Sequence, residues 1–104
     1  MSTFDERETA FEAKFAHDAE ARFKAEARVN RALGLWAAGL LGKTGAEAEA
    51  FALATVKADF AEAGHEDVVR MVAGALAGRA DAQAVRERRA DLLAAELARA
   101  ESGA

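Results

Sequence analysis

The chain contains no cysteine, proline, tyrosine or isoleucine, and these absences remove several classes of protein at once. Without cysteine, a disulfide scaffold, a zinc ribbon and a thiol nucleophile are excluded. No stretch of about 18 apolar residues occurs, so we expect no membrane insertion, and the charges throughout positions 1–15 are unlike the apolar segment of a signal peptide. We therefore expect a cytoplasmic protein, and its net charge of −4 disfavours nucleic acid as the main partner.

Alanine is the most abundant residue of this sequence. Of the 104 residues, 52% are hydrophobic, but 30 of those 54 are Ala, which leaves 24 larger apolar side chains for a core. Ala, Glu, Arg, Leu and Lys are the strongest helix formers. The β-branched residues are only six Val and four Thr, which supply a sheet poorly. The composition predicts a single all-α domain.

Glycines are the main signals for the ends of helices. Gly42 is placed to end one helix in the left-handed conformation, and Thr44 is placed to begin the next with Glu47 as its capping-box partner. Gly64 and Gly78 mark two further breaks, and Asp81 is a suitable N-cap after the second of them. The short connections predict a four-helix bundle with antiparallel neighbours. The expected helices cover residues about 19–41, 46–63, 66–77 and 82–100.

Narrow apolar stripes at helical spacing predict which faces are buried. Gly34 and Gly39 lower the stability of the first helix. Close approach of another helix beside Trp36 would explain why glycine stands at these two positions. The expected stripes of the other three helices are Leu53, Val56 and Phe60; Val68, Val69, Val72 and Leu76; and Val85, Leu92, Leu93 and Leu97.

The first helical stretch carries an interrupted stripe. Phe4, Phe11 and Phe15 share one face by spacings of seven and four, and that face continues toward Val29. Between them it carries three charged residues, Asp18, Arg22 and Glu26. A core helix does not interrupt its stripe in this way, so we divide the chain into an amphipathic arm, residues 1–18, and a bundle, residues 19–104. A partner groove that accepts the Phe rings would fix the arm, and folding of the arm back onto its own bundle is the alternative.

No catalytic constellation is present in the sequence. His17 and His65 lack the ligand spacing of a metal site, and Ser2 and Ser102 lack a placed base. The Gly42–Gly45 segment does not follow a strand, so it is not a phosphate loop, although Lys43 and Thr44 at a helix start form a candidate for weak anion binding. Arg86, Arg88 and Arg89 form a basic cluster, expected to be a solvated face or a docking site for an acidic partner.

Several segments together resemble the ζ subunit family of inhibitors of the alphaproteobacterial F-type ATP synthase. The resemblance covers nearly the whole chain, and it is carried by Phe11–Asp18, Leu33–Ala38, Leu41–Gly45, Val56–Phe60 and Ala63–Val68. It implies a four-helix bundle with a mobile, intrinsically disordered N-terminal segment that enters a catalytic interface of the ATP synthase head. There it blocks rotation in the direction of ATP hydrolysis.

The resemblance also implies which residues act and in what setting. It implies a non-enzymatic protein without cofactor or metal, monomeric when free, and peripheral to the inner membrane through the ATP synthase. The arm residues expected to bind the partner are Phe4, Arg7, Glu8, Phe11, Glu12, Lys14, Phe15, His17 and Asp18. Two other classes of function stay open from the residues alone: a small nucleotide- or anion-binding regulatory module that uses Lys43, and a homodimerising bundle in which the Phe arm is the self-interface.

Overall fold

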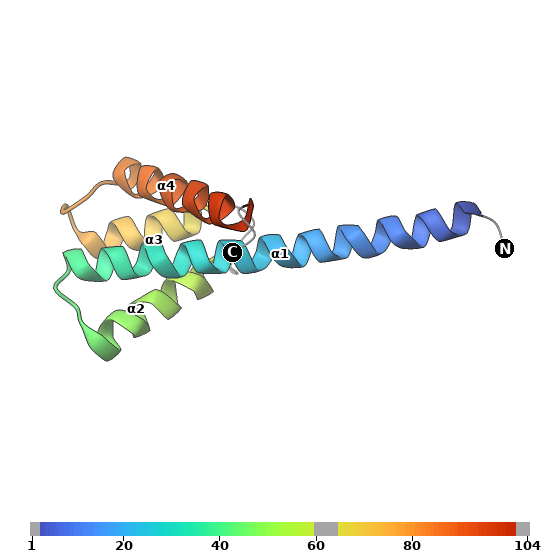
Figure 1. Cartoon of the computed structure of the whole chain (residues 1–104). Helices are drawn as coiled ribbons and strands as arrows, with labels where there is room; N and C mark the ends of the chain where they lie inside the picture. The colour runs from blue at the N-terminus through green and yellow to red at the C-terminus, as the bar shows by residue number, and fades with distance from the viewer. Residues whose placement is uncertain (1–2, 60–64, 102–104) are drawn as a thin grey trace.

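Four helices make up the described part of the chain in the computed structural model (Figure 1). The structure describes the backbone of residues 3–59 and 65–101, and the side chains of residues 19–59 and 65–99. The helices are α1 (Thr3–Leu40), α2 (Gly45–Ala58), α3 (Glu66–Leu76) and α4 (Ala82–Glu101). Within these ranges there is no strand, and the predicted all-α, four-helix architecture is confirmed.

Helix α1 is far longer than the bundle it belongs to. Its 38 residues correspond to about 57 Å at 1.5 Å per residue, and the whole molecule measures 61 × 29 × 26 Å. Only the C-terminal half of α1 lies among the other three helices, and the N-terminal half projects beyond them (Figure 1). The helix runs without a break through residues 18 and 19, where the interrupted stripe places the boundary between arm and bundle.

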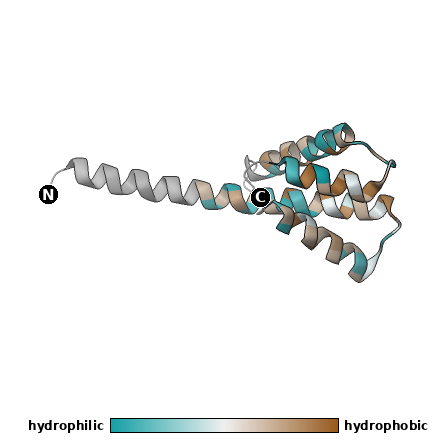
Figure 2. Ribbon diagram, turned by 180° about the vertical axis from the view of Figure 1, so that it is seen from behind, coloured by the Kyte–Doolittle hydropathy of each residue, from teal (hydrophilic) through white to brown (hydrophobic). Residues whose placement is uncertain are grey.

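The core lies where α1, α3 and α4 meet. Leu33 and Ala37 of α1 and Val85 of α4 are fully buried against the apolar face of α3. The stripe predicted for α3 is confirmed, since all four of its members are buried: Val68, Val69, Val72 and Leu76. Hydrophilic and hydrophobic residues alternate along the bundle helices, as amphipathic packing requires (Figure 2).

Helix α2 packs against α1 through small residues. A Cβ atom added to Gly34 would lie 2.7 Å from the Cα of Ala52 and 2.7 Å from Thr55 Oγ1. Ala52 and Thr55 are the buried residues of α2, and the Thr55 hydroxyl donates to the Phe51 carbonyl at 2.9 Å. The predicted close approach is therefore correct for Gly34. It is wrong for Gly39, which has nothing within 4 Å.

Two leucines of the predicted stripes are exposed, so their predicted burial is wrong. Leu53 is 55% exposed and Leu97 is 51% exposed. Because the contact between α1 and α2 is made by Gly34 and Ala52, the bulkier Leu53 points outward. Phe60, the third residue expected on the α2 stripe, lies outside the described residues.

The helix ends follow the glycine and aspartate signals in part. Gly42 and Gly78 have φ values of +75° and +91°, in the left-handed region that glycine tolerates best. Asp81 Oδ1 accepts a hydrogen bond from the Ala84 backbone N–H at 2.8 Å, so the predicted N-cap is confirmed. The predicted capping box at Thr44 is wrong, because the Thr44 side chain makes no cap hydrogen bond. Gly64 lies outside the described residues.

The two glycines of α1 predict opposite responses to the same substitution. Gly34→Ala should lower the free energy of unfolding by about 1–2 kcal/mol, because overpacking against the α2 backbone exceeds the gain in helix propensity. Gly39→Ala, in open space on the same helix, should raise it by about 0.5–1 kcal/mol. Chemical denaturation measures both values, and a loss at Gly39 equal to that at Gly34 would contradict the proposed close approach.

Candidate functional site

The region where α1 leaves the bundle is the candidate site. Residues 19–24 are all exposed, although they cover more than one full turn of the helix, and Val29 is the first buried residue among the described side chains of α1. The partner-binding residues expected on the arm, from Phe4 to Asp18, all belong to the projecting section of α1 before this point. Their side chains lie outside the described residues.

Hydrogen bonds between polar side chains hold α1 against its neighbours, just after the point where α1 enters the bundle. The Asn30 amide donates to Asp59 Oδ2 at 2.9 Å, and Arg89 Nε donates to Asn30 Oδ1 at 3.1 Å. Asn30 is 1% exposed, and Arg89 is 6% exposed. These bonds connect α1 to α4 and to the residue that follows α2, so they hold the helix in one register against its neighbours.

His65 extends this network to the start of α3. Its Nδ1 atom lies 3.4 Å from Asp59 Oδ1, and its Nε2 atom lies 3.5 Å from Glu26 Oε1. The ring therefore bridges a carboxylate on α1 and a carboxylate at the end of α2. In the sequence, His65 lacks the spacing that a metal ligand requires. Its contacts depend on residues that are 6 and 39 positions away along the chain.

Sequence reasoning also missed the buried position of Arg89. Arg89 lies four residues after the buried Val85, which places it on the apolar stripe of α4. That spacing is the signal that could have identified it. Its Nη2 atom is buried and, among the described residues, has no hydrogen-bond partner, so its burial carries a free-energy cost that Asn30 offsets only in part.

Of the basic cluster predicted on α4, Arg86 and Arg88 are exposed and Arg89 is buried, and each of the three contacts another helix. Arg86 donates to both carboxylate oxygens of Glu66 on α3, at 3.1 and 2.7 Å, and this hydrogen bonding lowers the pKa of Glu66. The Arg88 guanidinium lies 5.2 Å from the centre of the Trp36 ring. With Arg89 bound to Asn30, the three arginines hold α4 against α1 and α3.

A second ionic cluster joins α1 to the end of α4. Glu96 accepts hydrogen bonds from Arg99 on its own helix and from Arg28 on α1. These two guanidinium groups, Arg99 first, lower the pKa of Glu96 to about 2. The Glu96 side chain is only 12% exposed, whereas Arg28 is 51% exposed. The pair fixes α1 to α4 within two residues of Asn30.

The candidate anion-binding residues are remote from this region. Lys43 and Thr44 form the connection between α1 and α2, beyond the end of α1 that lies opposite to the arm. The Lys43 backbone N–H donates to the Ala38 carbonyl at 2.8 Å, and Thr44 has an extended backbone. Across the described side chains, no group of three or more histidine, aspartate or glutamate residues is arranged to hold a metal ion.

The fold and this junction define a class: a small helical bundle that carries one of its helices out of the bundle as an extension. The chain belongs to the family described as ATPase inhibitor subunit zeta, which matches residues 1–101. The expected resemblance to the ζ subunit family is therefore confirmed, and the protein is a member of a family of ATPase inhibitors.

One solved structure supports the same fold. A protein whose structure was determined in solution by NMR is 49% identical in sequence, with a TM-score of 0.70, over 80% of this chain and 98% of that chain. Among curated proteins, no sequence matches this chain. In the part of the chain that the structure describes, no helix combines the length and the apolar character needed to cross a membrane.

The buried amide of Asn30 predicts a large loss on truncation. Asn30→Ala should lower the free energy of unfolding by about 1–3 kcal/mol, because it leaves Arg89 and Asp59 without their shared partner. Gln83→Ala removes a side-chain amide from an exposed position on α4 and should change stability by less than about 0.5 kcal/mol. Urea denaturation of both variants checks this, and similar losses would contradict the anchoring role of Asn30.

The lowered pKa of Glu96 predicts a pH-dependent contribution to stability. A carboxyl whose pKa falls from 4.5 to about 2 on folding stabilises the native state above pH 4.5, and this contribution is lost as the pH falls through about 2. The wild-type chain should therefore be more stable than Glu96→Gln at pH 7, and the difference should narrow between pH 5 and pH 2. Thermal unfolding across this range measures the difference, and a constant gap would contradict the assignment.

Proposed function

We propose that this protein inhibits the F-type ATP synthase without any chemistry of its own. Its N-terminal arm, residues 1–18, enters a catalytic interface of the head and blocks rotation in the direction of ATP hydrolysis. The observation that carries this proposal is the continuation of α1 beyond a bundle whose core does not need it. The protein would then be cytoplasmic and held at the inner membrane only through the ATP synthase.

The burial pattern supports different roles for the two halves of α1, the second half packing in the bundle and the first half contacting another protein. Every described buried residue of α1 lies at or after Val29, and the ionic contacts that tie α1 to α4 begin at Arg28. Residues 19–24, the part of the projecting section whose side chains the structure describes, are all exposed. A helix of 38 residues with only its second half packed is therefore suited to presenting its first half to another protein.

The continuity of α1 makes folding on the target easier. A free segment of 18 residues must first nucleate a helix, which is unfavourable by a factor of roughly 10⁻³. The arm extends a helix that the bundle already holds, so it needs propagation alone. Burial of three Phe rings then contributes about 1.5–3 kcal/mol each, against an ordering cost of about 1–2 kcal/mol per residue that the helical hydrogen bonds and charged contacts help to offset.

The shape of the molecule suits a wedge that stops at a defined depth. A single α-helix is about 10–12 Å wide with its side chains, whereas the other two dimensions of the molecule are 29 and 26 Å. A slot that admits the arm would exclude the bundle. Rotation is then blocked by an inserted helix, and the bundle keeps it from passing further into the head.

Removal of the arm tests this function directly. A chain that lacks residues 1–18 should unfold in a cooperative transition, because the core is built from Val29 onward, and it should lose inhibition of ATP hydrolysis by the isolated head. In the full-length chain, Phe11→Ala with Phe15→Ala should weaken inhibition at least tenfold, since two anchoring rings are lost.

The matched control is Leu53→Ala, an exposed apolar residue of α2 that should leave inhibition unchanged. Undiminished inhibition by the shortened chain would overturn the proposal. The two alternative functions make different predictions: a homodimer would be seen by light scattering of the isolated protein, and a nucleotide-binding module would give a binding isotherm with ATP or ADP in calorimetry.

A further inference from the structure

We propose that the groove at the exit of α1 is a second contact with the ATP synthase head, where it receives an apolar side chain flanked by a carboxylate. This inference rests on the proposed function, because it extends the surface that the arm presents. We call this feature the exit groove. Its floor is apolar, with Ala21, Ala25 and Leu97, and its rim is mainly basic, with Arg22, Lys24 and Arg28 beside one acid, Glu20.

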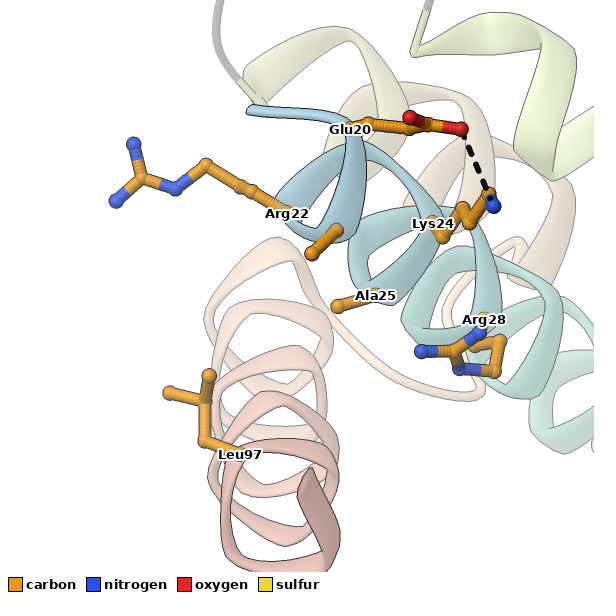
Figure 3. Close-up of a pocket in the computed structure, with 7 residues that line it drawn as sticks. Glu20, Arg22, Lys24, Ala25, Arg28 and Leu97 are labelled. Carbon is orange, nitrogen blue, oxygen red and sulfur yellow. Dashed lines mark ion pairs between the residues drawn. The ribbon is translucent and has the colours of Figure 1, made fainter. Parts of the chain in front are cut away.

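The exit groove is an open hollow of about 660 Å³ between the first exposed turns of α1 and the end of α4. Leu97 stands on α4 and faces the alanine side of α1 (Figure 3). A neighbouring hollow of about 390 Å³ shares Arg22, Ala25 and Leu97 and continues toward Leu93 and His65. Leu97, 51% exposed, therefore forms the boundary between two apolar hollows, and a side chain that fills either one would cover it.

The charges of the rim point to a carboxylate on the partner. Lys24 pairs with Glu20 at 3.3 Å, and Arg28 pairs with Glu96. Arg22 makes no ion pair with any described side chain, and its guanidinium extends away from both helices (Figure 3). Among the described side chains, Arg22 is thus a cation without an ion pair beside an apolar floor, and a carboxylate next to an apolar side chain complements both features.

The geometry of α1 places one edge of this groove, at Arg22, on the same face as the Phe positions of the arm. Phe4 and Arg22 are 18 residues apart, which is five full turns of an α-helix, and Phe15 and Arg22 are separated by about two turns. Because α1 is unbroken from Thr3 to Leu40, Arg22 lies on the line of the three Phe positions, about 10 Å beyond Phe15. A surface of the head that holds the Phe face therefore meets Arg22 next, at the edge of the exit groove.

Full-length variants test the exit groove by titrating inhibition of ATP hydrolysis by the isolated head. Arg22→Glu and Leu97→Asp should each weaken inhibition about tenfold, and Arg22→Lys should retain most of it. The loss for Arg22→Gln should be smaller than for Arg22→Glu and should shrink at high salt, because a screened ion pair contributes less.

Two controls match these changes at positions away from the exit. Lys57→Glu reverses an exposed charge on α2, and Leu53→Asp places a carboxylate at a leucine that is 55% exposed; both should inhibit within about twofold of the wild type. Urea denaturation of every variant separates a lost contact from a lost fold, and Leu97→Ala replaces Leu97→Asp if the aspartate variant is unstable.

The outcomes separate this inference from the proposed function. If the chain that lacks residues 1–18 still inhibits, the proposed function fails. If that chain is inactive while the Arg22 and Leu97 variants inhibit like the wild type, the arm acts alone and the exit-groove contact is overturned. A dimer in light scattering that Leu97→Asp disperses, with inhibition unchanged, would assign the groove to a second copy of this chain and would equally overturn the contact.

Discussion

The packing of Leu33 and Ala37 against the valine-rich face of α3 is the contact on which the rest of the molecule depends. With only 24 large apolar residues, the chain has one small core, and it lies along the second half of α1. Once this contact forms, α2 closes through Gly34 and α4 through Val85. The position of the core thereby determines how much of α1 is left to project.

The parts of the fold that were predictable from the sequence are those set by local pattern. The four valine and leucine positions of α3 were correct because a narrow stripe among polar residues allows one buried face. The left-handed turn at Gly42, the break at Gly78 and the cap at Asp81 were correct for the same local reason. The buried face of α2 was not predicted correctly. Alanine and threonine make its contact with α1, and a search for large apolar residues cannot identify such a face.

The polar junction could not be predicted because its partners are far apart in the sequence. Arg89 and Asn30 are separated by 59 positions, and Arg28 and Glu96 by 68. An isolated arginine in a charged helix indicates a solvated face, and only the packing of α4 on α1 turns Arg89 inward. The division into arm and bundle stays a prediction. Two of the three charges that interrupt the stripe, Arg22 and Glu26, lie before the first buried residue described in α1, Val29.

The unbroken course of α1 has a mechanical consequence. Because α1 runs unbroken from Thr3 to Leu40, it forms one continuous shaft, so a torque applied to its first turns is passed on to the part that lies in the bundle. The load would reach the bundle at Arg28 and Asn30, where hydrogen bonds to α4 and to the residue after α2 fasten the shaft. If the arm is inserted as proposed, a rotor that pressed on it would therefore act on the whole bundle through these two residues.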